Sequence, residues 1–443
     1  MDMGGWDVIT ASNVAKINAV LAASTGKLLP QFSFTDSAQA LSFQGSFGPW
    51  AIQPGGSANR INLLVPITTG TLSFPEFSTP LSLDGVKPIL NLALTLVEGT
   101  SSGTQSLVFN ITTNSATPSN ADGAVYIANP DETGLLAKRD PTKVASQLFR
   151  DWFGEIFVQN KAKISFVFAT VFSNPQGQPW LTPKATSVSY FESLDRTIQA
   201  VGIRTLTQSP WGPSGLTAAV DPSLLIATDD YFFSMAEAVF LRNLLLPAVA
   251  AALGVPTSSL RFNGPSQPNQ QNSCSITNAT NISLPSVENA GTHYYPVLSS
   301  YSVTISNNQI ITTGSGSFDI TGLHDAYVTF DNLRVVNAVA YNPSTRQLTF
   351  SIVSENSPST SRHIPWYEEA IAWIVPVIGA IVTIVMNIVV STIESSVENA
   401  VKGTGSLSVG TISLSTAVWA GLDQVDVTEA DLADAFVIRA KAS

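Results

Sequence analysis

The sequence is poor in the residues on which most protein chemistry depends. Its 443 residues include one cysteine, three histidines, and 21 lysines and arginines. Because Cys274 stands alone, no disulfide can form within the chain, as is usual for a protein made in a reducing compartment. The histidines His293, His324 and His363 are far apart, so the sequence lacks the paired spacing of a helical zinc site.

Charged side chains are scarce as well. They make up 12% of the residues, about half of the quarter that is usual in soluble proteins. The net charge is −11, and without clustered lysine and arginine we expect no nucleic-acid partner. The same acidic balance argues against docking on an anionic membrane by charge alone. The first ten residues, MDMGGWDVIT, contain neither the basic region nor the apolar core of a classical secretory signal.

Catalytic motifs are missing too. The sequence has no G-x-S-x-G nucleophile elbow and no phosphate-binding loop, and its glycine-rich stretches at 55–57 and 314–317 predict turns. The acidic residues from Asp423 to Asp434 lack the central glycine of a calcium loop, and they predict a solvent-facing helix that begins near Thr428. We therefore expect a protein that is not an enzyme and that binds no metal or cofactor.

The longest apolar segment is Ile371–Val390, which carries no charged residue. As a helix it would be roughly 30 Å long, about the thickness of a bilayer core. Acidic residues flank it on both sides, and no cluster of lysine or arginine stands beside it to orient a spanning helix. The favoured interpretation is a helix over residues 365–401 that is buried inside the protein. The alternative is a helix that spans or inserts into a membrane.

Most of the remaining sequence alternates between apolar and polar residues, which predicts antiparallel strands. The alternation is clearest at Leu41–Phe47, Leu90–Val97 and Leu107–Ile111, and it returns between residues 301 and 353. Residues 163–172 place apolar side chains on both faces of an extended chain, which predicts a strand covered on both faces.

Two further helices are expected. Ser12 or Asn13 can cap a short helix whose apolar residues follow at helical spacing. Asp229 or Asp230 can cap an apolar helix that runs through Phe232, Phe233, Val239 and Phe240 and ends near Gly254. The fold class predicted by these elements is α+β, with apolar helices inside a curved antiparallel sheet.

Five short motifs stand in a fixed order along the chain: GWDVI at 5–9, FGPWAI with GGS at 47–57, LDGVKP at 83–88, WLTP at 180–183 and FLRNLLLP at 240–247. In this order they resemble the clostridial P-forty-seven family, companions of botulinum neurotoxin in OrfX-type gene clusters. The chain lacks the lysine runs and the high asparagine and isoleucine content of the clostridial members, which indicates another bacterial source.

This resemblance implies a TULIP-like (tubular lipid-binding) fold, in which a long, highly curved antiparallel sheet wraps around long apolar helices. The implied function is non-enzymatic lipid binding, as an accessory or partner of a bacterial toxin complex. Its partners would be a lipid or another apolar ligand, a protein encoded in the same toxin cluster, and transiently a membrane. Two alternatives are a scaffold of a toxin complex without lipid, and a pore-forming or insecticidal protein that uses the helix at 365–401.

The predicted groove is lined by apolar side chains of the two predicted long helices. These are Phe232, Phe233, Val239, Phe240, Trp373, Ile374, Ile378, Ile381, Val385 and Ile388. We expect two halves, residues 1–225 with a short helix and strands, and residues 226–443 with both long apolar helices. We also expect synthesis in a bacterial cytoplasm and, for any release, a non-classical route.

Overall fold

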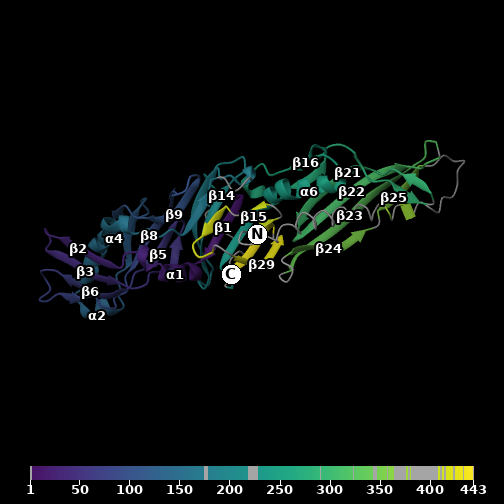
Figure 1. The fold of residues 1–443 in the computed structure, drawn as a ribbon. Helices are drawn as coiled ribbons and strands as arrows, with labels where there is room; N and C mark the ends of the chain where they lie inside the picture. The colour runs from purple at the N-terminus through teal and green to yellow at the C-terminus, as the bar shows by residue number, and fades with distance from the viewer. Residues whose placement is uncertain are drawn as a thin grey trace.

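The computed structural model is an elongated molecule built mostly from antiparallel strands (Figure 1). It describes the chain except residues 1, 174–177, 218–227, 290, 323, 343–346, 357, 364–375, 378–379, 381–407, 410–411, 414–415, 423–424, 433 and 443. A four-stranded and an eight-stranded sheet form one end (Figure 1). A six-stranded sheet with both termini lies in the middle, and a second eight-stranded sheet forms the other end (Figure 1).

The N-terminal end confirms the strands predicted from alternation. The four-stranded sheet consists of β2 (Gln31–Asp36), β3 (Leu41–Phe47), β6 (Ile67–Ser73) and β7 (Leu81–Ser82). Its eight-stranded neighbour consists of β4 (Ala51–Ser57), β5 (Arg60–Leu64), β8 (Ile89–Glu98), β9 (Thr104–Asn110), β10 (Thr113–Asn114), β11 (Ala124–Asn129), β12 (Ala169–Phe172) and β28 (Ala417–Trp419). The strand predicted over 163–172 is shorter than expected, since only its last four residues pair with β9.

Helices cover these sheets at two places. The predicted first helix is α1 (Val14–Ala23), and Asn13 caps it by accepting a hydrogen bond from the Ala15 backbone N–H at 2.9 Å. A helix over residues 144–160 was not predicted. It consists of α3 (Val144–Leu148), a π-helical turn (Phe149–Phe153) and α4 (Gly154–Asn160). Its phenylalanines pack against those of β2 and β3, and Phe43 meets Phe149 edge-on at 5.4 Å between ring centroids.

The structure also contains several shorter helical segments. They are α2 (Leu135–Arg139) and the 3₁₀ turns Thr25–Lys27, Lys161–Lys163, Pro179–Leu181, Thr257–Ser259 and Pro268–Gln270.

The central sheet joins segments from distant parts of the chain. Its strands, in spatial order, are β13 (Ala185–Glu192), β14 (Gln199–Leu206), β1 (Val8–Asn13), β15 (Tyr231–Ala236), β30 (Ala435–Ala442) and β29 (Val425–Leu432). All neighbours in this sheet are antiparallel. The first and the last long strands of the chain therefore flank the same strand, β15 (Figure 1).

One predicted helix begins later than expected, and another is a strand of this sheet. The segment after Asp230 is strand β15, and the helix begins only at Glu237. All six residues of β15 are buried, and a strand covered on both faces has the same continuous apolar composition as a buried helix. The segment around Thr428 is the edge strand β29, whose acidic residues are typical of an exposed sheet edge.

The C-terminal sheet confirms the strands predicted between residues 301 and 353. It consists of β16 (Leu260–Asn263), β17 (Ser275–Asn278), β18 (Ile282–Ser283), β21 (Val297–Ser306), β22 (Gln309–Asp319), β23 (Tyr327–Asn342), β24 (Gln347–Asn356) and β25 (Ser359–His363). Two small hairpins are β19 (Val287–Asn289) with β20 (Thr292–Tyr294), and β26 (Ser408–Val409) with β27 (Ile412–Ser413). The polar stretch 263–281 contains β17 and the 3₁₀ turn Pro268–Gln270.

A helix connects the central and C-terminal sheets. It consists of α5 (Glu237–Phe240), a π-helical turn (Leu241–Leu245) and α6 (Leu246–Leu253). Gly254 ends it with a φ of 66°, a left-handed conformation that glycine adopts without a steric penalty.

Two other predictions fall outside the described residues. Most of the predicted helix at 365–401 lies there, with its groove residues Trp373, Ile374, Ile378, Ile381, Val385 and Ile388. The expected boundary at residue 225 lies in the segment 218–227, and it stays a prediction. Within the described ranges, no helix has both the length and the apolar character required to cross a bilayer.

The carboxylate of Asp7 fixes the N-terminal segment to the central sheet. It is 1% exposed and accepts hydrogen bonds from the backbone N–H groups of Thr207, Gln208 and Ser209 at 2.7, 2.8 and 3.0 Å. The Ser209 hydroxyl donates to it as well. The backbone of Asp7 bonds in turn to Thr205 and Ala236, so one residue ties β14 and β15 to the start of β1.

We predict that Asp7→Ala lowers the free energy of unfolding by about 3–5 kcal/mol, because three buried N–H groups lose a charged acceptor. Chemical denaturation followed by circular dichroism measures this loss. The control is Asp36→Ala, which removes a carboxylate that accepts two N–H bonds in an exposed turn and should cost less than about 1 kcal/mol. Equal losses in the two variants would contradict the role given to Asp7.

Candidate functional site

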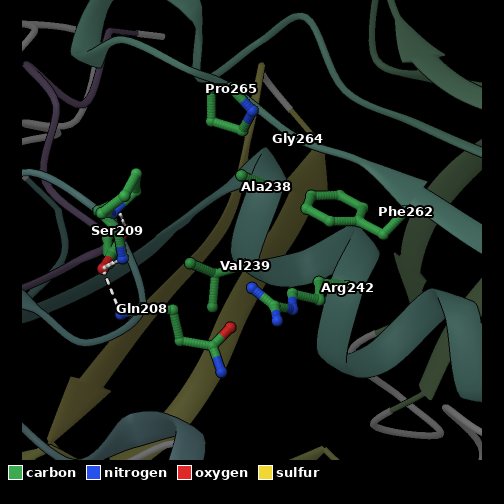
Figure 2. Close-up of a pocket in the computed structure, with 10 residues that line it drawn as sticks. Gln208, Ser209, Ala238, Val239, Arg242, Phe262, Gly264 and Pro265 are labelled. Atoms are coloured by element: carbon green, nitrogen blue, oxygen red, sulfur yellow. Dashed lines mark hydrogen bonds between the residues drawn. The ribbon is translucent and has the colours of Figure 1, made fainter.

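A cavity of about 290 Å³ lies where the central sheet meets the connecting helix (Figure 2). Its lining combines a loop after β14, the first turns of the helix and the end of β16. The lining residues are Asp7, Gln208, Ser209, Pro210, Ala238, Val239, Arg242, Phe262, Gly264 and Pro265. We refer to this site as the Val239 pocket.

The Val239 pocket has an apolar wall and a cationic mouth. Val239 is 2% exposed, and the Phe262 ring faces it across the cavity (Figure 2). The exposed Arg242 places its guanidinium carbon 5.9 Å from the centroid of the Phe262 ring, within the range of a cation–π contact. The Gln208 side chain lies beside that of Arg242 (Figure 2). It accepts a hydrogen bond from the Asn243 amide at 2.8 Å.

Asp7 holds the loop at residues 207–209, which forms one side of the pocket, in place. Its bonds to residues 207–209 hold the loop that carries Gln208 and Ser209 into the lining. A loop fixed by a buried carboxylate loses little further freedom when a ligand binds, which lowers the entropic cost of binding.

A buried carboxyl group lies at the start of the helix that forms one wall. Glu237 is 2% exposed, and within the described part of the chain its Oε1 atom has no hydrogen-bond partner. Burial raises the pKa of Glu237 to about 8; the backbone N–H of Cys274 opposes the shift, and the charge of Asp434 adds to it. The carboxyl group is therefore mostly protonated at neutral pH.

The structure separates the predicted groove residues that it describes. Phe232 and Phe233 are neighbours on β15 and face opposite sides of the sheet, and Phe232 packs in a small cluster with Phe191. Phe240 stacks on Phe436 with ring centroids 5.1 Å apart and is part of the core. Only Val239 lines the pocket.

Sequence reasoning missed the polar side of this pocket. Gln208, Arg242 and Phe262 lie in three separate segments that only the tertiary structure brings together. One signal was present, since Asp7 belongs to the GWDVI motif and is the acid that holds the pocket loop.

The described ranges contain no candidate metal site, and their histidines lie apart from one another. No group of three or more histidine, cysteine, aspartate or glutamate side chains there could hold an ion. His293 and His363 are exposed, and the imidazole of His324 lies 2.8 Å from the exposed carboxylate of Asp325.

Comparison with known proteins identifies the family. A sequence profile of the OrfX-like family, described as Protein OrfX2/OrfX3/P47, matches residues 3–437. The chain belongs to the OrfX-like family. This confirms the resemblance seen in the five sequence motifs. A comparison with curated protein sequences gives no match.

Solved structures of OrfX-like proteins share the fold along the whole chain. P47 from Clostridium botulinum A2 is 20% identical with a TM-score of 0.75, and the match covers 100% of this chain and 98% of that one. P47 of Clostridium botulinum E1 is 19% identical with a TM-score of 0.78, and the match covers 99% of both chains. A lipopolysaccharide binding protein matches with a TM-score of 0.26 and 10% identity, which is too low to support an inference.

We predict that Glu237 makes the protein less stable as pH rises from 5 to 8. The folded-state pKa of about 8 exceeds the ordinary value of 4.5, so this contribution to stability is complete below 4.5 and is lost as pH rises through 8. The slope is at most about 1.4 kcal/mol per pH unit. In Glu237→Gln the free energy of unfolding should change less with pH over this range, as measured by urea titrations at pH 5, 6.5 and 8.

The matched control is Glu98→Gln, which neutralises an exposed glutamate at the end of β8. It should keep the pH slope of the wild type. A slope that is the same in the wild type and in Glu237→Gln would show that Glu237 ionises normally in the folded state.

Proposed function

We propose that the protein is a non-enzymatic accessory component of a bacterial toxin complex, and that its Val239 pocket holds an apolar ligand. The observation that supports the accessory role most strongly is the family match over residues 3–437. The same topology over the full length of two P47 chains supports a shared architecture.

The lining of the pocket supports a ligand with an apolar chain and a negative group. Ala238, Val239, Phe262 and two prolines offer hydrocarbon surface, and Arg242 supplies a positive charge at the edge. Each methylene group buried there would contribute about 0.8 kcal/mol before entropic costs. A volume of about 290 Å³ is at the lower end of ligand pockets, which favours one acyl chain over a phospholipid with two.

The absence of catalysis is part of the same proposal. The three histidines lie at exposed positions on separate segments, and none of them lines the Val239 pocket. Binding in that pocket requires only packing, one cation and a rigid loop. Lipid binding by a TULIP-type fold is the broader form of this proposal.

We predict that the wild type takes up a fluorescent fatty acid with saturation, and that Val239→Trp weakens this uptake at least about tenfold. The indole would fill the cavity that the acyl chain needs. The control is Val97→Trp, which adds the same side chain at a position that is 42% exposed and lies outside the pocket. Circular dichroism melts of both variants would establish that they are folded.

Three other results would each favour a different function. Equal uptake by Val239→Trp and the wild type would place the ligand elsewhere. No saturable uptake, together with binding to a larger protein encoded beside this one, would favour a scaffold without lipid. Release of dye from liposomes as the pH falls would favour a pore-forming protein.

A further inference from the structure

A second cavity, of about 440 Å³, lies between the N-terminal and central sheets. Strands β8 and β9 form one side, and β13 and β14 form the other. Its polar lining residues are Asn59, Thr95, Gln105, Thr186, Ser187 and Arg204. None of them lines the Val239 pocket, so the two cavities are distinct.

Arg204 brings a positive charge into this cavity. It is 4% exposed, and strands β13 and β1 flank it. Its Nη2 group donates to the Ser187 hydroxyl at 2.8 Å, and Nη1 donates to the Thr217 carbonyl. The guanidinium carbon lies 4.8 Å from the centroid of the Trp6 ring. Its Nε–H group is buried and has no hydrogen-bond partner among the residues that the structure describes.

Two other buried arginines provide a comparison, one with a carboxylate partner and one with neutral oxygen acceptors. Arg439 forms an ion pair with Glu429. Arg60 donates to Asn91 twice and to the Ala124 carbonyl, at 2.6–3.2 Å. Among the described residues, Arg204 has no carboxylate partner, and its only oxygen acceptors are one carbonyl and one hydroxyl group.

The charge of Arg204 persists at neutral pH. Burial lowers the pKa of Arg204 to about 10, which is still far above 7. A buried cation without a counter-charge is costly for a folded protein, whereas a paired one is tolerated. Asp7, the acid next to Trp6, is already engaged with the backbone of residues 207–209.

We propose that this cavity binds an oxyanion, a phosphate or a carboxylate, with Arg204 as its charge partner. The Nε–H group of Arg204 is a donor for a charge-assisted hydrogen bond, and the Gln105 amide and the Thr186 hydroxyl are further donors in the lining. The aliphatic residues Leu94 and Val188 also line the cavity, so an ester with a short hydrocarbon tail fits as well as the free ion.

Isothermal titration of the full chain with inorganic phosphate and with hexyl phosphate, at constant ionic strength, tests this site. The wild type should bind at least one of them with saturation. Arg204→Met, which keeps an unbranched apolar stem but removes the guanidinium group, should bind at least tenfold more weakly. The control Arg196→Met removes an exposed arginine from the β13–β14 turn and should bind within twofold of the wild type.

Ser187→Asp tests the proposal without removing Arg204. A carboxylate at this position would lie beside the guanidinium and replace the external anion. This variant should bind phosphate at least tenfold more weakly than the wild type, and its thermal midpoint should be higher in the absence of ligand. It also covers the case in which Arg204→Met does not fold.

The outcomes distinguish a free anion from a phosphate ester, and they distinguish binding in this cavity from binding in the Val239 pocket. Binding of inorganic phosphate would support a free ion, and binding of hexyl phosphate alone would support an ester. The binding of either compound must persist in Val239→Trp, because this substitution alters only the Val239 pocket. The proposal is overturned if the wild type binds neither compound, or if Arg204→Met and Ser187→Asp bind both as the wild type does.

Discussion

The buried carboxylate of Asp7 is the interaction on which the rest of the architecture depends. Asp7 lies immediately before β1, the strand that pairs with β14 on one side and β15 on the other. An unpaired carboxylate would be expensive to bury, but three backbone N–H groups and a hydroxyl surround this one. The same contacts join residues about 200 positions apart in the sequence.

Trp6 and Asp7 also connect the two cavities. Asp7 lies in the lining of the Val239 pocket, while the ring of Trp6 covers the guanidinium of Arg204 in the second cavity. The indole N–H of Trp6 donates to the Thr217 carbonyl, which also accepts from Arg204. Two adjacent residues of one motif thus contribute to both sites. One is the Val239 pocket with the exposed Arg242, and the other is the polar cavity with the buried Arg204.

The sequence predicted local patterns well and long-range assembly poorly. Alternation located β3, β8 and β9, and the cap at Asn13 located α1, because these signals depend on neighbouring residues. It failed at β15, where burial on both faces removes the alternation that distinguishes a strand from a helix. The spacing of Phe149, Phe153 and Phe157 could have revealed the missed helix. Of the pocket, only Val239 was predicted, since Gln208, Arg242 and Phe262 meet only after folding.

The order of strands in the central sheet has a consequence for synthesis on the ribosome. β15 pairs with β1, which emerges early, and with β30, whose last residue is Ala442. Until β30 has been synthesised, one edge of β15 lacks this partner, and an apolar edge strand is a template for wrong pairing. The nascent chain must therefore keep residues 231–236 from pairing wrongly until β30 has been synthesised, about 200 residues after β15.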